Sequence, residues 1–141
     1  MYALLYRSRA RPGLLASDLN EVIATAETRN RELDVTGLLL YGQLPAVPGA
    51  PGEFVQWIEG PEEAVETLYH EIASDDRHFD IEVLARGPIA ELTGNTNIPT
   101  VGRLFPSWSM GLVRLSELPA TQSGFLEFAR EWDGDVAAMA A

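Results

Sequence analysis

Short apolar segments alternate with longer amphipathic stretches over the first 85 residues, and this order limits the possible folds more than any other feature of the chain. Segments 1–7, 34–41, 54–58 and 80–85 are short and rich in branched or aromatic residues, which predicts strands. Between them, residues 18–30 and the stretch after Pro61 carry apolar residues at helical spacing. A βαββαβ order predicts a ferredoxin-like α+β sandwich with both helices on one face of the sheet.

Two further elements follow this core. Residues 105–113 predict an added fifth strand, and residues 123–132 predict a C-terminal helix with Phe125, Phe128 and Trp132 on one face. We therefore expect a core over residues 1–113 and a helical extension over residues 114–141, with a frayed end. Two stretches that contain glycine and proline, residues 42–52 and 91–103, predict loops.

The chain is strongly acidic and lacks cysteine. Its formal net charge is −11 at pH 7, so its surface repels the phosphates of nucleic acids and anionic membranes, and neither is an expected partner. The absence of cysteine excludes disulfides and thiolate ligands or nucleophiles. No apolar run approaches the roughly 20 residues of a membrane span, and the N-terminus carries no basic leader, so a cytoplasmic location is expected.

Three polar side chains interrupt otherwise apolar elements. Tyr6 lies near the end of the first predicted strand, Gln56 in the middle of the third, and Asn30 at the end of the first predicted helix. Each has a simple structural explanation: a core tyrosine, a solvent-facing glutamine and a helix C-cap. A glutamine that faces the helices would instead need hydrogen-bond partners, because an unpaired buried amide costs about 1–3 kcal/mol. Trp108 and Met110 lie two residues apart and so share a strand face, where core packing is the ordinary explanation.

Six short motifs, each weak alone, occur together in a distinctive order. They are LLYRSRA at 4–10, N-R-x-x-x-V-T-G-L-L-L-Y at 30–41, FVQWIEGP at 54–61, AVETLYHEI at 64–72, DDRH at 75–78 and FPSWSMG at 105–111. With these motifs the chain resembles the BLUF family, the sensors of blue light using flavin adenine dinucleotide. The resemblance runs from Tyr2 to about Leu112.

The resemblance implies a role for each of the polar residues. Tyr6 corresponds to the tyrosine that gives an electron and then a proton to the excited flavin, and Gln56 to the glutamine between that hydroxyl and the flavin ring. Asn30 corresponds to the asparagine at the C4 carbonyl and N3 of the ring. The implied photoactive residues are Tyr6, Gln56, Trp108 and Met110. The implied flavin-binding residues are Tyr6, Val22, Arg29, Asn30, Gln56, Ile72, Asp75, Arg77 and His78.

The implied cofactor is FAD, and FMN could occupy the same ring site. The candidates for binding its phosphates are Arg29, Arg31, Arg77 and His78, although basic residues near 77–78 could equally cap the second helix. The sequence departs from the family pattern at Glu71, where relatives often carry Arg or His, and in the longer stretches 42–52 and 93–101.

We therefore expect a flavin photoreceptor rather than an enzyme, with no metal site. Two alternatives stay open: a flavin-binding or acylphosphatase-like enzyme on the same fold, and a non-photoactive dimerisation module. Signalling would run through a separate effector protein or a change in self-assembly, and a homo-oligomer is expected. The expected contact surfaces are an exposed sheet face and helix 123–132, unless that helix packs back on the sheet.

Overall fold

The computed structural model describes residues 1–14, 16–44, 51–94 and 102–132. Along the chain the elements are β1 (Tyr2–Ala10), α1 (Ala16–Leu33), β2 (Thr36–Gln43), β3 (Glu53–Gly60), α2 (Glu62–Ala73), β4 (His78–Pro88), α3 (Ile89–Leu92), β5 (Trp108–Arg114), a 3₁₀ turn (Leu115–Glu117) and α4 (Gln122–Arg130).

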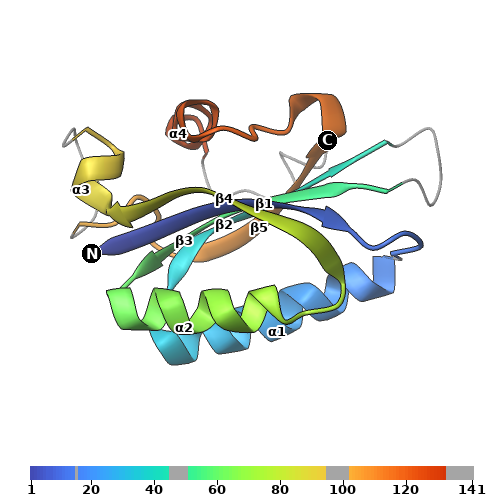
Figure 1. The fold of residues 1–141 in the computed structure, drawn as a ribbon, viewed down its shortest axis with the longest axis horizontal. Coiled ribbons are helices and arrows are strands. Elements are labelled where there is room, and N and C mark those ends of the chain that lie inside the picture. The colour runs from blue at the N-terminus through green and yellow to red at the C-terminus, as the bar shows by residue number, and fades with distance from the viewer. Residues whose placement is uncertain (15, 45–50, 95–101, 133–141) are drawn as a thin grey trace.

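The five strands form one sheet in the order β4-β1-β3-β2-β5. All neighbouring pairs are antiparallel except β2 and β5, which are parallel. Helices α1 and α2 lie side by side on one face of the sheet, and α4 lies on the other (Figure 1). The predicted ferredoxin-like α+β fold with an added strand and C-terminal helix is confirmed.

Strand register decides which side chains face α1 and α2. Gln56 of β3 lies directly opposite Tyr6 of β1 and Leu39 of β2. Because side chains alternate along a strand, Trp57 points to the opposite face, where it joins the buried cluster beneath α4. The helix face of β3 therefore carries Gln56 and the α4 face carries Trp57, as the alternation predicts.

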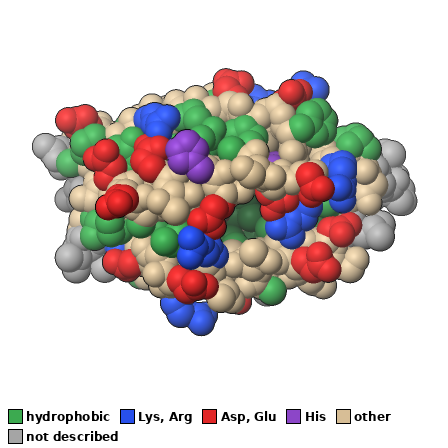
Figure 2. Space-filling model, turned by 60° about the horizontal axis from the view of Figure 1, so that its bottom comes forward, with side chains coloured by type: hydrophobic (Ala, Val, Ile, Leu, Met, Phe, Trp, Pro, Cys, Tyr) green, Lys and Arg blue, Asp and Glu red, His purple; other side chains and the backbone are tan. Residues whose placement is uncertain are grey.

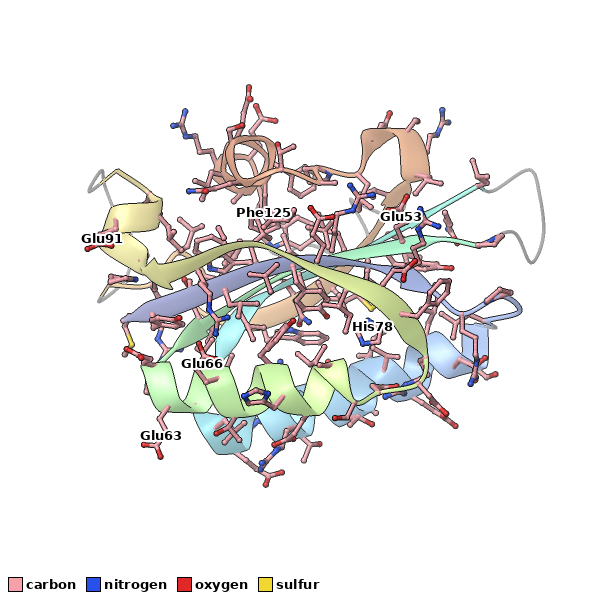
Figure 3. All side chains as sticks on the ribbon, viewed as in Figure 1. Glu53, Glu63, Glu66, His78, Glu91 and Phe125 are labelled. Atoms are coloured by element: carbon pink, nitrogen blue, oxygen red, sulfur yellow. The ribbon has the colours of Figure 1, made fainter. Side chains whose placement is uncertain are left out.

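The C-terminal helix covers the second face of the sheet. Phe125 of α4 is fully buried and stacks on Trp57, with ring centroids 5.8 Å apart and planes 7° from parallel. Figure 3 shows Phe125 on this side and His78 on the side of α1 and α2. Thr121 caps the start of α4 by accepting a 3.0 Å hydrogen bond from the Gly124 N–H. The alternative that this helix packs back on the sheet is therefore confirmed, and the expectation of an exposed contact surface on this face is wrong for the described residues.

Helix α1 continues one turn past its predicted end at Asn30. It stops because Asp34 adopts a left-handed conformation, with φ of 58°, and the Val35 N–H then bonds the Asn30 carbonyl at 2.9 Å. This arrangement is a Schellman-type C-cap. The side chain of Asn30 consequently lies inside the last turn of the helix, so the C-cap explanation of this residue is wrong.

Other boundaries differ from the sequence prediction by a few residues. Strand β1 continues to Ala10 because residues 9 and 10 pair with β4. The predicted fifth strand begins only at Trp108, and the one-turn helix α3 was not predicted. Parts of both predicted loops and the end of the C-terminal extension, at 45–50, 95–101 and 133–141, lie outside the described residues. No helix in the described part of the chain is long and apolar enough to cross a membrane.

Candidate flavin site

A cavity lies between α1, α2 and the facing side of the sheet. Figure 2 shows this face hollowed near its middle, with hydrophobic side chains at the floor and charged side chains of both signs around the opening. The residues that line the cavity are Tyr6, Val22, Thr25, Ala26, Arg29, Asn30, Leu39, Phe54, Gln56, Leu68, Glu71, Ile72, Asp75, Arg77 and His78.

A chain of hydrogen bonds at this cavity links side chains of β5, β3 and β1. The Trp108 indole N–H donates to Gln56 Oε1 over 3.0 Å, and Gln56 Nε2 donates to the Tyr6 hydroxyl over 2.7 Å. Gln56 is 4% exposed and Tyr6 is 3% exposed. The buried amide is therefore paired at both ends, and the solvent-facing explanation of Gln56 is wrong.

Burial also controls the protonation of Tyr6. Loss of hydration disfavours the phenolate and raises the pKa of Tyr6 well above its usual range, while the hydrogen bond from Gln56 offsets part of that increase. The hydroxyl accepts from Gln56 and still has its own proton to donate. Tyr6 is therefore a neutral phenol, which would release its hydroxyl proton only together with an electron.

Asn30 presents an unused hydrogen-bond donor to the cavity. Its side chain is 2% exposed, and Nδ2 finds no hydrogen-bond partner among the described residues. A buried amide N–H without a partner costs roughly 1–3 kcal/mol, so this group is explained best by a ligand that accepts from it.

Apolar side chains form part of the cavity wall. Val22 of α1 and Ile72 of α2 line it from the two helices, and Leu39, Phe54 and Leu68 complete its apolar lining. Leu39, Phe54 and Leu68 were not predicted from sequence as cavity residues, and neither were Thr25 and Ala26. Their spacing could have identified them, since Leu39 faces Gln56 across the sheet and Leu68 lies one helical turn before Ile72.

Both arginines that line the cavity are paired with carboxylates. Arg29 of α1 bonds Glu71 of α2 through two contacts, Nε to Oε1 at 2.8 Å and Nη2 to Oε2 at 2.7 Å. Arg77 bonds both carboxylate oxygens of Asp75, and this pairing holds the pKa of Asp75 below its usual range. The Glu71 that departs from the family pattern therefore ties Arg29 across the gap between the helices.

His78 lines the cavity but uses both ring nitrogens inside the protein. Nε2 donates to the Ile72 carbonyl over 2.7 Å, since a carbonyl can only accept, and Nδ1 lies 2.7 Å from Ser8 Oγ. These bonds join β1, α2 and β4, and they leave no ring N–H for a phosphate. Arg31, the remaining phosphate candidate, is exposed and does not line the cavity.

The structure brings the residues selected from sequence to one place. All nine implied flavin-binding residues line the cavity. Trp108 contacts Gln56 from the edge strand β5, across the intervening β2, and Met110 is buried in a cluster with Leu39 and Phe54. Their roles toward a ligand stay predictions.

The donors and walls of the cavity suit a flavin ring. The pyrimidine edge of a flavin carries carbonyl acceptors and an N–H donor, which amides such as those of Asn30 and Gln56 can match. The unpaired Asn30 Nδ2 supplies the donor that such a carbonyl needs. Apolar side chains from both helices suit the faces of a flat aromatic system.

The family model for sensors of blue-light using FAD, BLUF, matches residues 1–111. The photoactivated adenylate cyclase subunit beta of Euglena longa is 39% identical over 88 residues, which cover 62% of this chain and 9% of that protein. The blue light- and temperature-regulated antirepressor BluF of Escherichia coli (strain K12) is 37% identical over 78 residues, which cover 55% of this chain and 17% of that one.

A solved structure of similar size also matches. The dark-state structure of the BLUF protein BlrB is 32% identical, with a TM-score of 0.59, and the match covers 96% of this chain and 89% of that chain. By contrast, this chain spans less than a fifth of the cyclase subunit and the antirepressor. From the family model and the shared fold, the chain belongs to the BLUF family, the sensors of blue light that use FAD.

Proposed function

We propose that this chain binds a flavin non-covalently, in the cavity between α1 and α2. It would signal by exchanging hydrogen bonds around Tyr6 and Gln56. The observation that carries the proposal is the hydrogen-bond chain from half-buried Trp108 through Gln56 to Tyr6, in which the last two residues are buried and line the cavity. Asn30 would anchor the pyrimidine edge of the ring, and Val22 and Ile72 would enclose its faces.

Tyr6 and Gln56 would have different roles in the light reaction. When bound, the flavin supplies a strongly oxidising electron acceptor once it has absorbed blue light. Tyr6 is the side chain that would release the electron together with its hydroxyl proton, because its raised pKa keeps the phenol neutral beforehand. Gln56 would respond because an amide can exchange donor and acceptor ends by rotating or by tautomerising.

Rotation of this amide has a direct consequence for Trp108. In the present arrangement the indole N–H bonds Gln56 Oε1. A half-turn of the amide would set its NH₂ group against the indole N–H, and two donors cannot bond each other. Trp108 would then leave its place, and the change would pass to β5. We propose that Met110, which lies two residues along that strand, also changes its surroundings.

The natural cofactor is proposed to be FAD, with FMN as the alternative. Contacts to the flavin ring would supply most of the affinity for either cofactor. Arg29 and Arg77 would add little for the phosphates, because both are paired with carboxylates. The proposed division is a photosensor core over residues 1–113 and a C-terminal helical extension over residues 114–141. We propose a cytoplasmic protein that forms a homo-oligomer and passes its signal to a separate effector.

The discriminating experiment is the colour of the purified protein. A yellow protein whose visible spectrum shifts to the red under blue light, and returns in darkness, would support the proposal. A colourless protein that no flavin can reconstitute would exclude it. Bound flavin without any light response would instead favour a flavin enzyme.

A further inference from the structure

Glu59 is a buried carboxylate on the face of the sheet away from the cavity. It is 0% exposed, and burial raises the pKa of its carboxyl group. The sequence places it at the approach to the second helix, but the structure places it inside β3, two residues after Trp57. A fully buried acid that no part of the flavin site uses needs another explanation.

The carboxylate of Glu59 holds the segment that leads into β5, here called the lead-in segment (residues 102–105). Oε1 accepts from the Leu104 N–H at 2.8 Å, and Oε2 accepts from the Phe105 N–H at 2.6 Å. Oε1 also accepts from the Trp57 indole N–H at 3.0 Å. Hydrogen bonds to a charged acceptor are stronger than those between neutral groups. The Glu59 carboxylate therefore holds the lead-in segment strongly in place.

Arg103 adds a second attachment for the same segment. Its guanidinium donates to the Asp34 carbonyl at 3.0 Å and to the Thr36 hydroxyl at 3.0 Å. These two residues lie where α1 ends and β2 begins. Glu59 thus ties the lead-in segment to β3, and Arg103 ties it to the turn before β2.

The lead-in segment delivers Trp108 to the cavity side. Phe105 belongs to the cluster beneath α4, while Trp108 belongs to the cluster beneath α1. Only two residues separate them, so the position of Phe105 limits where the indole of Trp108 can reach. Trp108 pairs with Gly37, where an added Cβ would lie 1.9 Å from the Trp57 carbonyl oxygen. The close approach at Gly37 is therefore between β2, which pairs with Trp108, and β3, which carries Glu59.

We propose that Glu59 is a positioning residue of the photosensor, whose contacts with the Leu104 and Phe105 N–H groups set the place of Trp108 beside Gln56. The inference rests on the proposed function of the Gln56 switch. Glu59 lies on the opposite face of the sheet from Gln56. It would affect the switch only through the lead-in segment.

The first test uses the flavin-free chain. Glu59→Gln keeps the shape of the side chain but loses the charge and one acceptor, so it should move the NMR signal of the Trp108 indole N–H, assigned with Trp108→Phe. Glu53→Gln is the matched control, because Glu53 also lies on β3 and bonds Arg7 rather than the lead-in segment. An unchanged Trp108 signal in folded Glu59→Gln protein would overturn the proposal.

The second test is a double-mutant cycle on the flavin-loaded protein. Glu59→Gln should change the rate of dark recovery by at least about twofold, the smallest effect expected for coupled residues. In the Trp108→Phe background the same substitution should change that rate no further. An equal effect in both backgrounds would show that Glu59 acts by another route, and so would overturn the inference.

Two further comparisons distinguish a folding defect of the variant and a failure of the proposed function from a failure of this inference. If Glu59→Gln does not fold, Glu59→Asp keeps the charge and withdraws the carboxylate by one methylene, and the same comparisons are made with it. If the unaltered chain shows no light response, the proposed function fails. The NMR test on the flavin-free chain still decides whether Glu59 positions Trp108.

Discussion

The Gln56 amide donates a 2.7 Å hydrogen bond to the Tyr6 hydroxyl, and the two residues are direct partners across β1 and β3. The backbone ladder fixes both Cα positions, so the contact can change only through rotation of the side chains. Because both side chains are buried, water does not compete for this bond. This pairing is the basis of the first prediction.

Tyr6→Phe should retain flavin and lose the light-induced red shift, because it removes the proton donor without altering the apolar ring. Tyr41→Phe is the matched control, since Tyr41 is another buried tyrosine, which packs against Phe54. The measurement is a difference spectrum after blue illumination. A normal red shift in the Tyr6 variant would contradict the assigned role.

Asn30→Ala should weaken flavin binding by about tenfold, the loss expected for one buried hydrogen bond. The same change should leave the flavin-free chain at least as stable, because Nδ2 has no partner there among the described residues. Fluorescence titration and urea unfolding measure the two effects, with the exposed Asn20→Ala as control. Loss of stability without loss of affinity would contradict the anchor role.

Riboflavin, FMN and FAD should bind with affinities within about tenfold of one another, because Arg29 and Arg77 are paired with carboxylates. Glu71→Gln should remove the α2 partner of Arg29 and leave only the longer 3.5 Å contact with Glu32. It should therefore raise the affinity for FMN over riboflavin by about two- to fivefold, the size expected from a half-exposed ion pair. Glu66→Gln breaks the similar pair with Arg86 and serves as control. A strong preference for FAD in the unaltered chain would contradict this expectation.

The amplitude of the red shift should stay constant as pH rises from about 7 to 10, because burial raises the pKa of Tyr6. In the unfolded chain this group ionises near pH 10, so the unfolded state loses its proton first. Stability is therefore lost as pH rises above about 10. Loss of the red shift near pH 8 in folded protein would show that Tyr6 is more acidic than its burial implies.

Phe125→Ala should destabilise the fold by about 3–5 kcal/mol, the usual cost of removing a buried aromatic ring. The ring is fully buried against Trp57. Phe79→Ala is the control, because Phe79 is 44% exposed on β4 and should change stability by less than about 0.5 kcal/mol. Equal costs for the two substitutions, measured by urea unfolding, would show that α4 is not held by this contact.

The order and faces of the strands were predictable because alternation along a strand is local. Gln56 and Trp57 had to face opposite ways, and pairing across the sheet then brought Tyr6 to Gln56. The boundaries were less predictable because they depend on distant partners. Strand β1 reaches Ala10 only because β4 pairs with it there.

The role of Glu59 could not be read from sequence for a similar reason. A glutamate just before Gly60 and Pro61 is typical of a helix start. Its burial depends on backbone N–H groups of Leu104 and Phe105, more than forty positions later in the chain. Asn30 is a different case. Its place on the first helix was predicted correctly, but the C-cap explanation was wrong, because the left-handed residue that ends α1 is Asp34.

The sheet separates the cavity from α4, and this separation bears on protein engineering. A domain fused after Arg130, where α4 ends, would leave the molecule from the side opposite the opening between α1 and α2 (Figure 1). Such a fusion would not obstruct the exchange of small molecules with the cavity. A fusion that crowds the loop after α2 would do so, because Asp75 and Arg77 in that loop line the cavity.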